Sequence, residues 1–83
     1  MVFTLKYEYK GNKIVVINEN TQESLYVNDE LQDKKTGIKT VSHLNGSLPS
    51  GEKINVSLIG GFYLKVELYI DGVLLEPIDI QNN

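Results

Sequence analysis

Few residues in this 83-residue chain could carry out catalysis. His43 is the only histidine, and the chain has no cysteine, so thiolate nucleophiles, thiolate metal sites and paired-histidine metal sites are excluded. Ser42 precedes His43 directly, and neighbours on a strand point to opposite faces, which is the wrong geometry for a hydrogen bond between these two residues. We predict a surface or half-buried His43, no enzymatic activity and no cofactor. The opposing hypothesis is an enzyme with His43 as general base near Asp29 or Asp33.

The acidic and glycine-rich segments are also poor matches to known ligand sites. Asp29, Glu30 and Asp33 miss most ligand positions of a calcium-binding EF-hand loop, so we predict solvated turn acids and no metal site. Gly60-Gly61 lacks the lysine and hydroxyl residue of a phosphate-binding loop, and no helix follows it. Its expected role is turn geometry.

The segment from Tyr63 to Tyr69 is the most suggestive one for binding. Apolar and polar residues alternate there, so one face belongs to the core and the other faces away from it. Tyrosines on such a face combine apolar area with a polar group, as recognition surfaces do. The predicted binding residues, with Ile59 expected opposite Tyr63, are Tyr63, Lys65, Glu67, Tyr69 and Ile59. The alternative is that they cover an ordinary sheet or pack against the N-terminal hairpin.

Composition indicates the elements that position these residues. Twenty residues are β-branched, alanine is absent, and no segment of ten or more residues shows a helical apolar period. Turn signals recur about every ten residues, from Gly11-Asn12 to Asp71-Gly72, as in hairpin-connected strands. We predict an all-β fold: a single antiparallel β-sandwich, or small β-barrel, of seven to eight strands spanning residues 1–83.

Charge and hydropathy restrict the partners. The net charge is −3 and arginine is absent, which argues against a nucleic-acid partner. No apolar run is long enough to span a membrane, and residues 1–10 alternate rather than form a signal peptide. We therefore expect a cytoplasmic protein.

The hairpins also predict strand registers. A turn at Gly11-Asn12 would pair Tyr7 with Val16. A three-residue loop at Gly60–Phe62 would pair Leu58 with Leu64. A turn at Asp71-Gly72 would pair Ile70 with Val73, and Pro77 marks an edge or a break in the last strand. We predict a hairpin around Asn28-Asp29, a charged loop over 33–37 and a strand over 38–44. The predicted core ladder comprises Ile54, Val56, Leu58, Leu64, Val66 and Leu68.

Two parts of the chain echo each other. The segments 13–16 and 25–31 parallel the segments 53–56 and 68–74, with the offset growing from 40 to 43. Two interpretations stay open. Either any two hairpins with the same patterning look alike, or a duplicated strand-hairpin unit forms the two halves of a sandwich.

Three sequence blocks carry a family resemblance. The runs LYVNDELQD (25–33), LNGSLPSGE (44–52) and YIDGVLL (69–75) resemble those of short, uncharacterised bacterial all-β proteins. This resemblance implies a β fold and brings no assigned activity. The strand and hairpin at 69–72 are also remotely similar to β-sandwich domains of the Fas apoptosis inhibitory molecule type, whose expected tryptophans this chain lacks.

These observations favour a small non-enzymatic interaction module that binds protein, either itself or another chain, with a homodimer as one option. It would self-associate through the Pro77-containing edge or the face bearing Tyr63 and Tyr69. The alternative is a carbohydrate-type ligand-binding domain in which Tyr63 and Tyr69 serve as stacking platforms.

Overall fold

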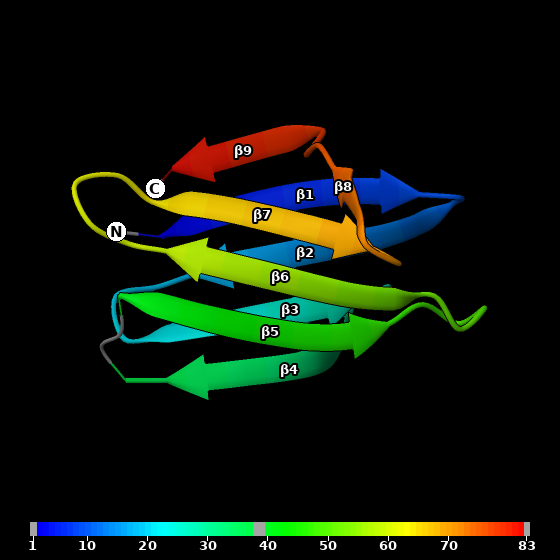
Figure 1. The fold of residues 1–83 in the computed structure, drawn as a ribbon, viewed down its shortest axis with the longest axis horizontal. Helices are drawn as coiled ribbons and strands as arrows, with labels where there is room; N and C mark the ends of the chain where they lie inside the picture. Colours follow the sequence, from blue (N-terminus) through cyan, green and yellow to red (C-terminus); the bar gives the residue numbers. More distant parts are fainter. Residues whose placement is uncertain (1, 38–39, 83) are drawn as a thin grey trace.

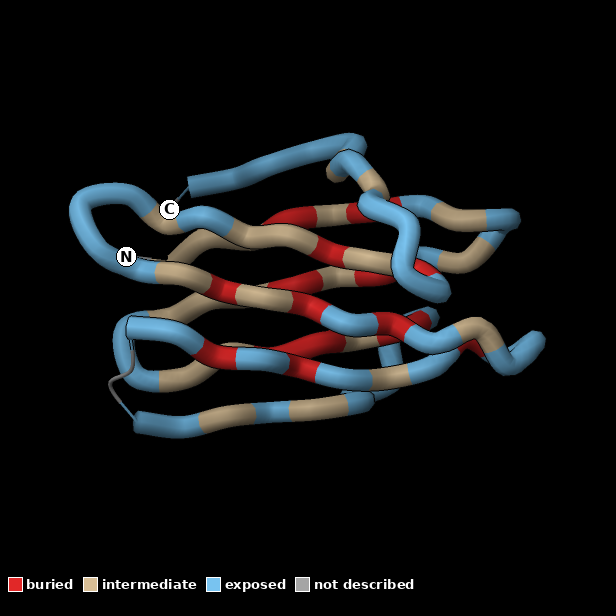
Figure 2. The backbone as a smooth tube through the Cα atoms, in the orientation of Figure 1, coloured by how far each residue is buried: buried red, intermediate tan, exposed pale blue. Residues whose placement is uncertain are grey.

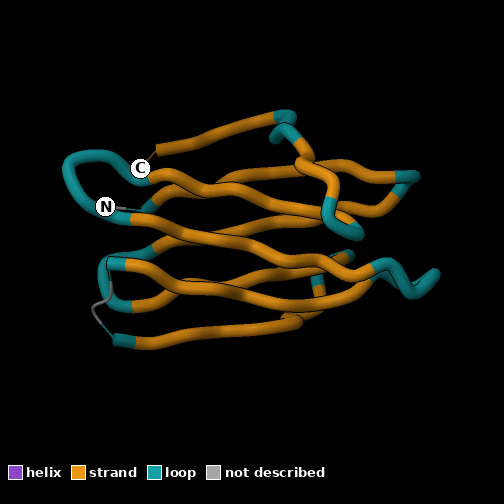
Figure 3. Tube along the Cα trace, in the orientation of Figure 1, coloured by secondary structure: helices purple, strands orange, loops and turns teal. Residues whose placement is uncertain are grey.

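Nine β-strands form two antiparallel sheets in the computed structural model of this chain, which describes residues 2–37 and 40–82. The larger sheet has the order β4-β3-β2-β1-β9, and the smaller has the order β5-β6-β7-β8, which lies in front in Figure 1. The strands are β1 (Phe3–Tyr9), β2 (Asn12–Asn18), β3 (Gln22–Val27), β4 (Glu30–Thr36), β5 (Val41–Ser47), β6 (Lys53–Ile59), β7 (Lys65–Ile70), β8 (Val73–Leu75) and β9 (Asp79–Asn82). The described part of the chain forms no helix (Figure 3), hence none that could cross a membrane.

The predicted all-β antiparallel sandwich is confirmed, but the expected number of seven to eight strands is wrong. The additional strand arises because Pro77 breaks the last predicted strand. The chain leaves the smaller sheet after Leu75 and joins the larger one at Asp79. The predicted charged loop over 33–37 is also wrong, since β4 continues to Thr36. β5 begins at Val41, and residues 38 and 39 of the strand expected there lie outside the described residues.

The core lies between the sheets and takes side chains from both. Figure 2 shows the buried residues recurring along strands of the two sheets. Four members of the predicted ladder, Ile54, Val56, Leu58 and Leu68, are buried, and Val66 packs against them half-buried. Leu64 was predicted wrongly as a ladder member, because it lies in the β6–β7 connection. The buried apolar residues are Leu5, Tyr7, Ile14, Val16, Leu25, Val27, Leu44, Leu48, Ile54, Val56, Leu58, Leu68 and Ile70.

Two predicted registers are wrong by two residues. The β1–β2 turn uses Lys10 and Gly11, both at positive φ (49° and 80°), so Tyr7 pairs with Ile14 rather than Val16. In the β6–β7 connection, the Gly60 N–H donates to the Thr40 carbonyl (2.7 Å), and the pairing of Ile59 with Lys65 leaves residues 60–64 as the loop. Leu58 therefore faces Val66. A shift of two keeps every strand residue on its predicted face.

The β7–β8 and β3–β4 hairpins form where the sequence predicts them. Ile70 pairs with Val73 across Asp71-Gly72, and Val27 pairs with Glu30 across Asn28-Asp29. All four turn residues have positive φ, as a two-residue turn between twisted strands requires. The values are 49° at Asn28, 70° at Asp29, 47° at Asp71 and 80° at Gly72.

The same hydrogen-bond pair anchors both of these turns. Asn28 Oδ1 accepts the Lys13 N–H (3.0 Å), and the Asn28 N–H donates to the Lys13 carbonyl (2.8 Å). Asp71 Oδ1 accepts the Lys53 N–H (2.9 Å), and the Asp71 N–H donates to the Lys53 carbonyl (2.9 Å). β1–β4 and β5–β8 each run as a four-strand meander within one sheet, and their last turns make these matched contacts.

One buried polar group is left without a partner. Ser42 faces inward from β5 opposite Leu58, is 4% exposed, and its Oγ has no hydrogen-bond partner among the described residues. We expect Ser42→Ala to raise the free energy of unfolding by about 1 kcal/mol, because it removes the cost of burying an unpaired hydroxyl. Urea denaturation measures this change. The control Ser47→Ala, exposed on the same strand, should stay within about 0.5 kcal/mol of wild type. A Ser42→Ala protein less stable than wild type would contradict the assignment.

Candidate interaction surfaces

The outer face of the smaller sheet carries four of the five predicted binding residues. Ile59 pairs with Lys65, and Glu67 and Tyr69 follow along β7, with their side chains directed away from the buried ladder. Lys65 is exposed, while Ile59, Glu67 and Tyr69 are half-buried. Leu74 of β8, 47% exposed, lies opposite Tyr69. The sequence therefore placed these residues on the correct face.

Tyr63 is not part of that face. It lies in the β6–β7 loop, where it is 88% exposed beside a fully exposed Phe62, so its predicted pairing with Ile59 is wrong. The loop and the start of β1 border a hollow of about 480 Å³. Its lining residues are Phe3, Asn18, Gly60, Gly61, Phe62, Tyr63 and Leu64. The tyrosine thus belongs to a separate aromatic loop.

His43 lies on the outer face of the smaller sheet, as the strand alternation predicts. Ser42 is buried and His43 exposed, so these neighbours do point to opposite faces. The serine beside His43 is Ser57 of β6, whose Oγ is 3.3 Å from His43 Nδ1. Glu67 lies opposite Ser57 on its other side. Ser57 stands between the imidazole and Glu67, whereas a catalytic triad places the imidazole between the serine and the acid.

The β4 and β5 strands approach each other and close one side of the sandwich. Asp33 Oδ2 accepts the Asn45 N–H (2.9 Å), and Gln32 Oε1 accepts the Ser47 N–H (3.4 Å). β5 is an edge strand, so these side chains satisfy backbone donors that a further strand would otherwise use. We call this the clamped side.

A β-bulge makes the clamp possible. β3 pairs Tyr26 with Leu31 but Leu25 with Asp33, which leaves Gln32 as an extra residue in β4. Two consecutive residues, Gln32 and Asp33, can then both reach β5. Gly46 permits the close approach, since a Cβ at that position would lie 3.1 Å from the Gln32 Cβ.

The opposite side of the sandwich, at β8 and β9, is open. Val73 pairs with buried Ile70, and Ile80 pairs with buried Leu5, so both side chains point toward the interior side of their sheets. Yet Val73 is 70% exposed and Ile80 is 59% exposed, because no strand of the other sheet covers them. Ile78, 68% exposed, lies just before β9. We call Val73, Ile78 and Ile80 the open side; Figure 1 shows β9 along the top of the molecule and β8 rising toward it from the end of β7.

The connection from β8 to β9 is anchored over β1. The Ile78 N–H donates to the Lys6 carbonyl (2.8 Å), and Glu76 lies near enough to Tyr7 to act on its phenol electrostatically. Burial, and secondarily the negative charge of Glu76, raises the pKa of Tyr7 to about 12. This connection therefore places β9 firmly beside β1.

Phe62 and the three residues of the open side were not among the predicted binding residues, although the Pro77-containing edge was predicted as one place of self-association. The only sequence signal for the open side is Pro77 followed by the alternating residues Ile78-Asp79-Ile80, which indicates a short edge strand. The described residues include no group of three or more histidine, aspartate or glutamate side chains placed to hold a metal ion.

Comparison with known proteins finds no family model, no curated protein and no solved structure that matches this chain. The resemblance of the three sequence blocks therefore stays a prediction, and function must be argued from the surfaces themselves.

The clamp should contribute measurably to stability. Asp33→Ala removes the acceptor for Asn45 and also for the Lys34 N–H (2.9 Å), so we expect the free energy of unfolding to fall by about 1 to 2 kcal/mol in urea denaturation. Glu30→Ala is the matched control, because Glu30 lies on the same strand and no described residue bonds its carboxylate. Equal losses in the two variants would show that the clamp bonds add nothing.

Proposed function

We propose that this domain is a non-enzymatic interaction module that self-associates through β9 and the open side. The observation that carries the proposal is an edge strand, β9, whose outer side pairs with no other described strand and which carries exposed Ile80 directly after exposed Ile78. Exposed apolar edges are templates for strand addition from another chain. An acidic, arginine-free surface supports a protein partner over a nucleic acid.

The other sheet edges are protected more strongly than β9, which has four residues and one charge. β4 presents the charged residues Lys34 and Lys35 and contains the bulge, and β5 has donors capped by the clamp. β8 is only three residues long. β9 has one acid, Asp79, and no lysine. Charge, bulges and short length are the usual defences against edge pairing, so β9 is the edge best suited to pair.

The hydrogen-bonding pattern fixes how two copies would meet. The tight β1–β2 turn directs the backbone groups of Thr4 and Lys6 toward β9, where they face Gln81 and Asp79. The backbone groups of Ile80 therefore point outward. Antiparallel pairing with Ile80 on the two-fold axis brings the two Ile80 side chains together. It sets Asp79 opposite Gln81 of the second copy, which avoids like charges facing each other.

The proposal retains the cytoplasm as the location. A four-residue edge gives few backbone bonds, so the proposed dimer is a weak, exchanging one.

Sedimentation velocity over a concentration series tests self-association. We expect the sedimentation coefficient of the wild type to rise with concentration. Ile80→Lys places a charge on the axis of the proposed pair and should weaken association at least about tenfold. Leu31→Lys is the control: Leu31 is similarly exposed (52%) but lies on β4, so association should persist. A wild type that stays monomeric throughout, or equal effects of both variants, would overturn the proposal. Circular dichroism confirms that the variants are folded.

A second candidate function is supported by the aromatic loop. Exposed Phe62 and Tyr63 border the 480 Å³ hollow, and Asn18 adds an amide, a combination that suits stacking and hydrogen bonding to a sugar ring. Tyr69 takes no part in this hollow, because it lies on the outer face of the smaller sheet, paired with Asn55 of β6. The carbohydrate alternative is therefore narrowed to Tyr63.

Thermal shift with a panel of saccharides tests this alternative. If the loop binds a sugar, the stabilising hit should disappear in Tyr63→Ala and persist in Tyr69→Ala. A panel without any hit, or a hit lost only in Tyr69→Ala, would reject it.

A further inference from the structure

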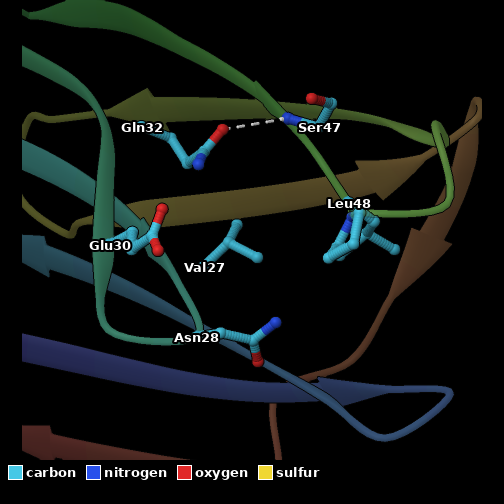
Figure 4. Close-up of a pocket in the computed structure, with 7 residues that line it drawn as sticks. Val27, Asn28, Glu30, Gln32, Ser47 and Leu48 are labelled. Carbon is cyan, nitrogen blue, oxygen red and sulfur yellow. Dashed lines mark hydrogen bonds between the residues drawn. The ribbon is translucent and has the colours of Figure 1, made fainter.

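A second hollow lies near the clamped side, between the β3–β4 turn and the residues that follow β5 (Figure 4). Its volume is about 390 Å³, within the range of small-molecule sites. It is independent of the open side, which lies across the sandwich from β4 and β5 (Figure 1). The lining residues are Val27, Asn28, Glu30, Gln32, Ser47, Leu48 and Pro49.

Apolar side chains form part of the wall of this hollow. Val27 and Leu48 are 4% and 3% exposed, so the core holds both of them in place. Pro49 adds a rigid ring beside Leu48. An aliphatic chain lying against these three residues would remove apolar surface from contact with water. The protein would not have to rearrange for this.

Two polar groups of the hollow are still available to a ligand. Gln32 uses Oε1 to accept the Ser47 N–H, and its Nε2 makes no hydrogen bond among the described residues. The Glu30 carboxylate has neither an ion pair nor a hydrogen bond within the same described ranges. Figure 4 shows the Gln32 amide nitrogen and the Glu30 carboxylate facing the space above Val27.

Asn28, the polar side chain at the base of the hollow, already has hydrogen-bond partners. Asn28 Oδ1 accepts the Lys13 N–H, and Asn28 Nδ2 donates to Asn12 Oδ1 (3.0 Å). Asp29, which lies between the lining residues Asn28 and Glu30 in the chain, is ion-paired with Lys13 (2.6 Å). Glu30 therefore supplies the one uncompensated charge of the hollow.

We propose that this hollow binds a basic amino-acid unit, arginine in particular, either free or within a peptide. The guanidinium would pair with the Glu30 carboxylate, for which its planar fork is suited. The aliphatic stem would lie over Val27 and Leu48. The carbonyl oxygen would accept from Gln32 Nε2. Glu30 and Gln32 are two residues apart, so their Cα atoms lie within about 7 Å of each other, a span that an arginine bridges from its guanidinium to its carbonyl.

The negative net charge of the domain favours the same ligand class. The chain contributes no arginine of its own and carries three more acidic than basic residues, so a cation gains attraction on approach. A neutral sugar would satisfy Gln32 but leave the Glu30 charge uncompensated.

Chemical-shift titration of the full chain by nitrogen-15 NMR tests the proposal. The probes are N-acetyl-arginine amide, which represents the peptide form, free arginine, and N-acetyl-citrulline amide, the neutral isostere of the first. We expect saturable shifts at Val27, Gln32, Ser47 and Leu48 with the arginine probes. Citrulline amide, and Glu30→Gln titrated with the arginine amide, should each show about tenfold weaker binding. Glu8→Gln, which removes an exposed acid on β1, should bind as wild type does.

The outcomes separate cleanly. Stronger binding of the arginine amide than of free arginine assigns the site to peptides, and the reverse order assigns it to the free amino acid. Absence of saturable shifts, equal binding of the citrulline probe, or equal losses in Glu30→Gln and Glu8→Gln would overturn the proposal. Because none of the variants touches β9, failure here leaves the self-association experiment unaffected.

Discussion

The approach of β4 to β5 decides which parts of this molecule remain available for binding. Asp33 reaches across to the Asn45 N–H at 2.9 Å, and this bond uses up an edge donor that strand addition would need. Gly46 is required at the crossing, since a Cβ there would also lie 3.1 Å from Leu25 Cδ2. With this side occupied by the clamp, the free edge of the fold is left at β9.

The two sheets share a four-strand meander topology, and the candidate surfaces lie where the two meanders differ. Both halves anchor their last hairpin in the same way, through Asn28 on Lys13 and through Asp71 on Lys53. The strands after those turns then differ: β4 runs for seven residues, whereas β8 stops after three. The long strand reaches the other sheet and closes one side. The short strand cannot, so Pro77 redirects the chain and β9 fills the position beside β1.

The alternation of apolar and polar residues predicted correctly which face of a strand is buried. It predicted poorly which residues pair across neighbouring strands, for a physical reason. The buried positions of β6 and β7 follow from alternation, which survives any shift of two residues. The register itself depends on which residues adopt positive φ. Lys10 does so at 49°, although its residue type gives no hint of it. Tyr63 was misplaced for a related reason, because the Gly60–Thr40 bond lengthens the loop and no local pattern encodes a contact to a distant strand.

The clamp was beyond sequence reasoning because a bulge is an exception to alternation. Strict alternation would send Gln32 and Asp33 to opposite faces, and the segment from Asp33 to Gly37 was predicted as a charged loop. The structure instead uses both residues on β5. The sequence pattern did not reveal β9 as a separate strand, because it is short and polar. Four residues with one apolar side chain carry little periodic signal.

The two proposed sites are compatible and would reinforce each other. Pairing through β9 extends the larger sheet of one copy into that of the next, so β4 ends up at both outer edges of the joined sheet. The hollow containing Glu30 lies beside β4, so a dimer would carry two such hollows at its far ends, neither covered by the interface. An exposed carboxylate alone binds a cation weakly, because water screens the pair. Two hollows on one assembly would let a peptide with two basic residues bind at both ends, and the second contact would benefit from the effective concentration set by the first. Self-association and ligand binding would then form one mechanism, in which the dimer supplies the avidity that the single site lacks.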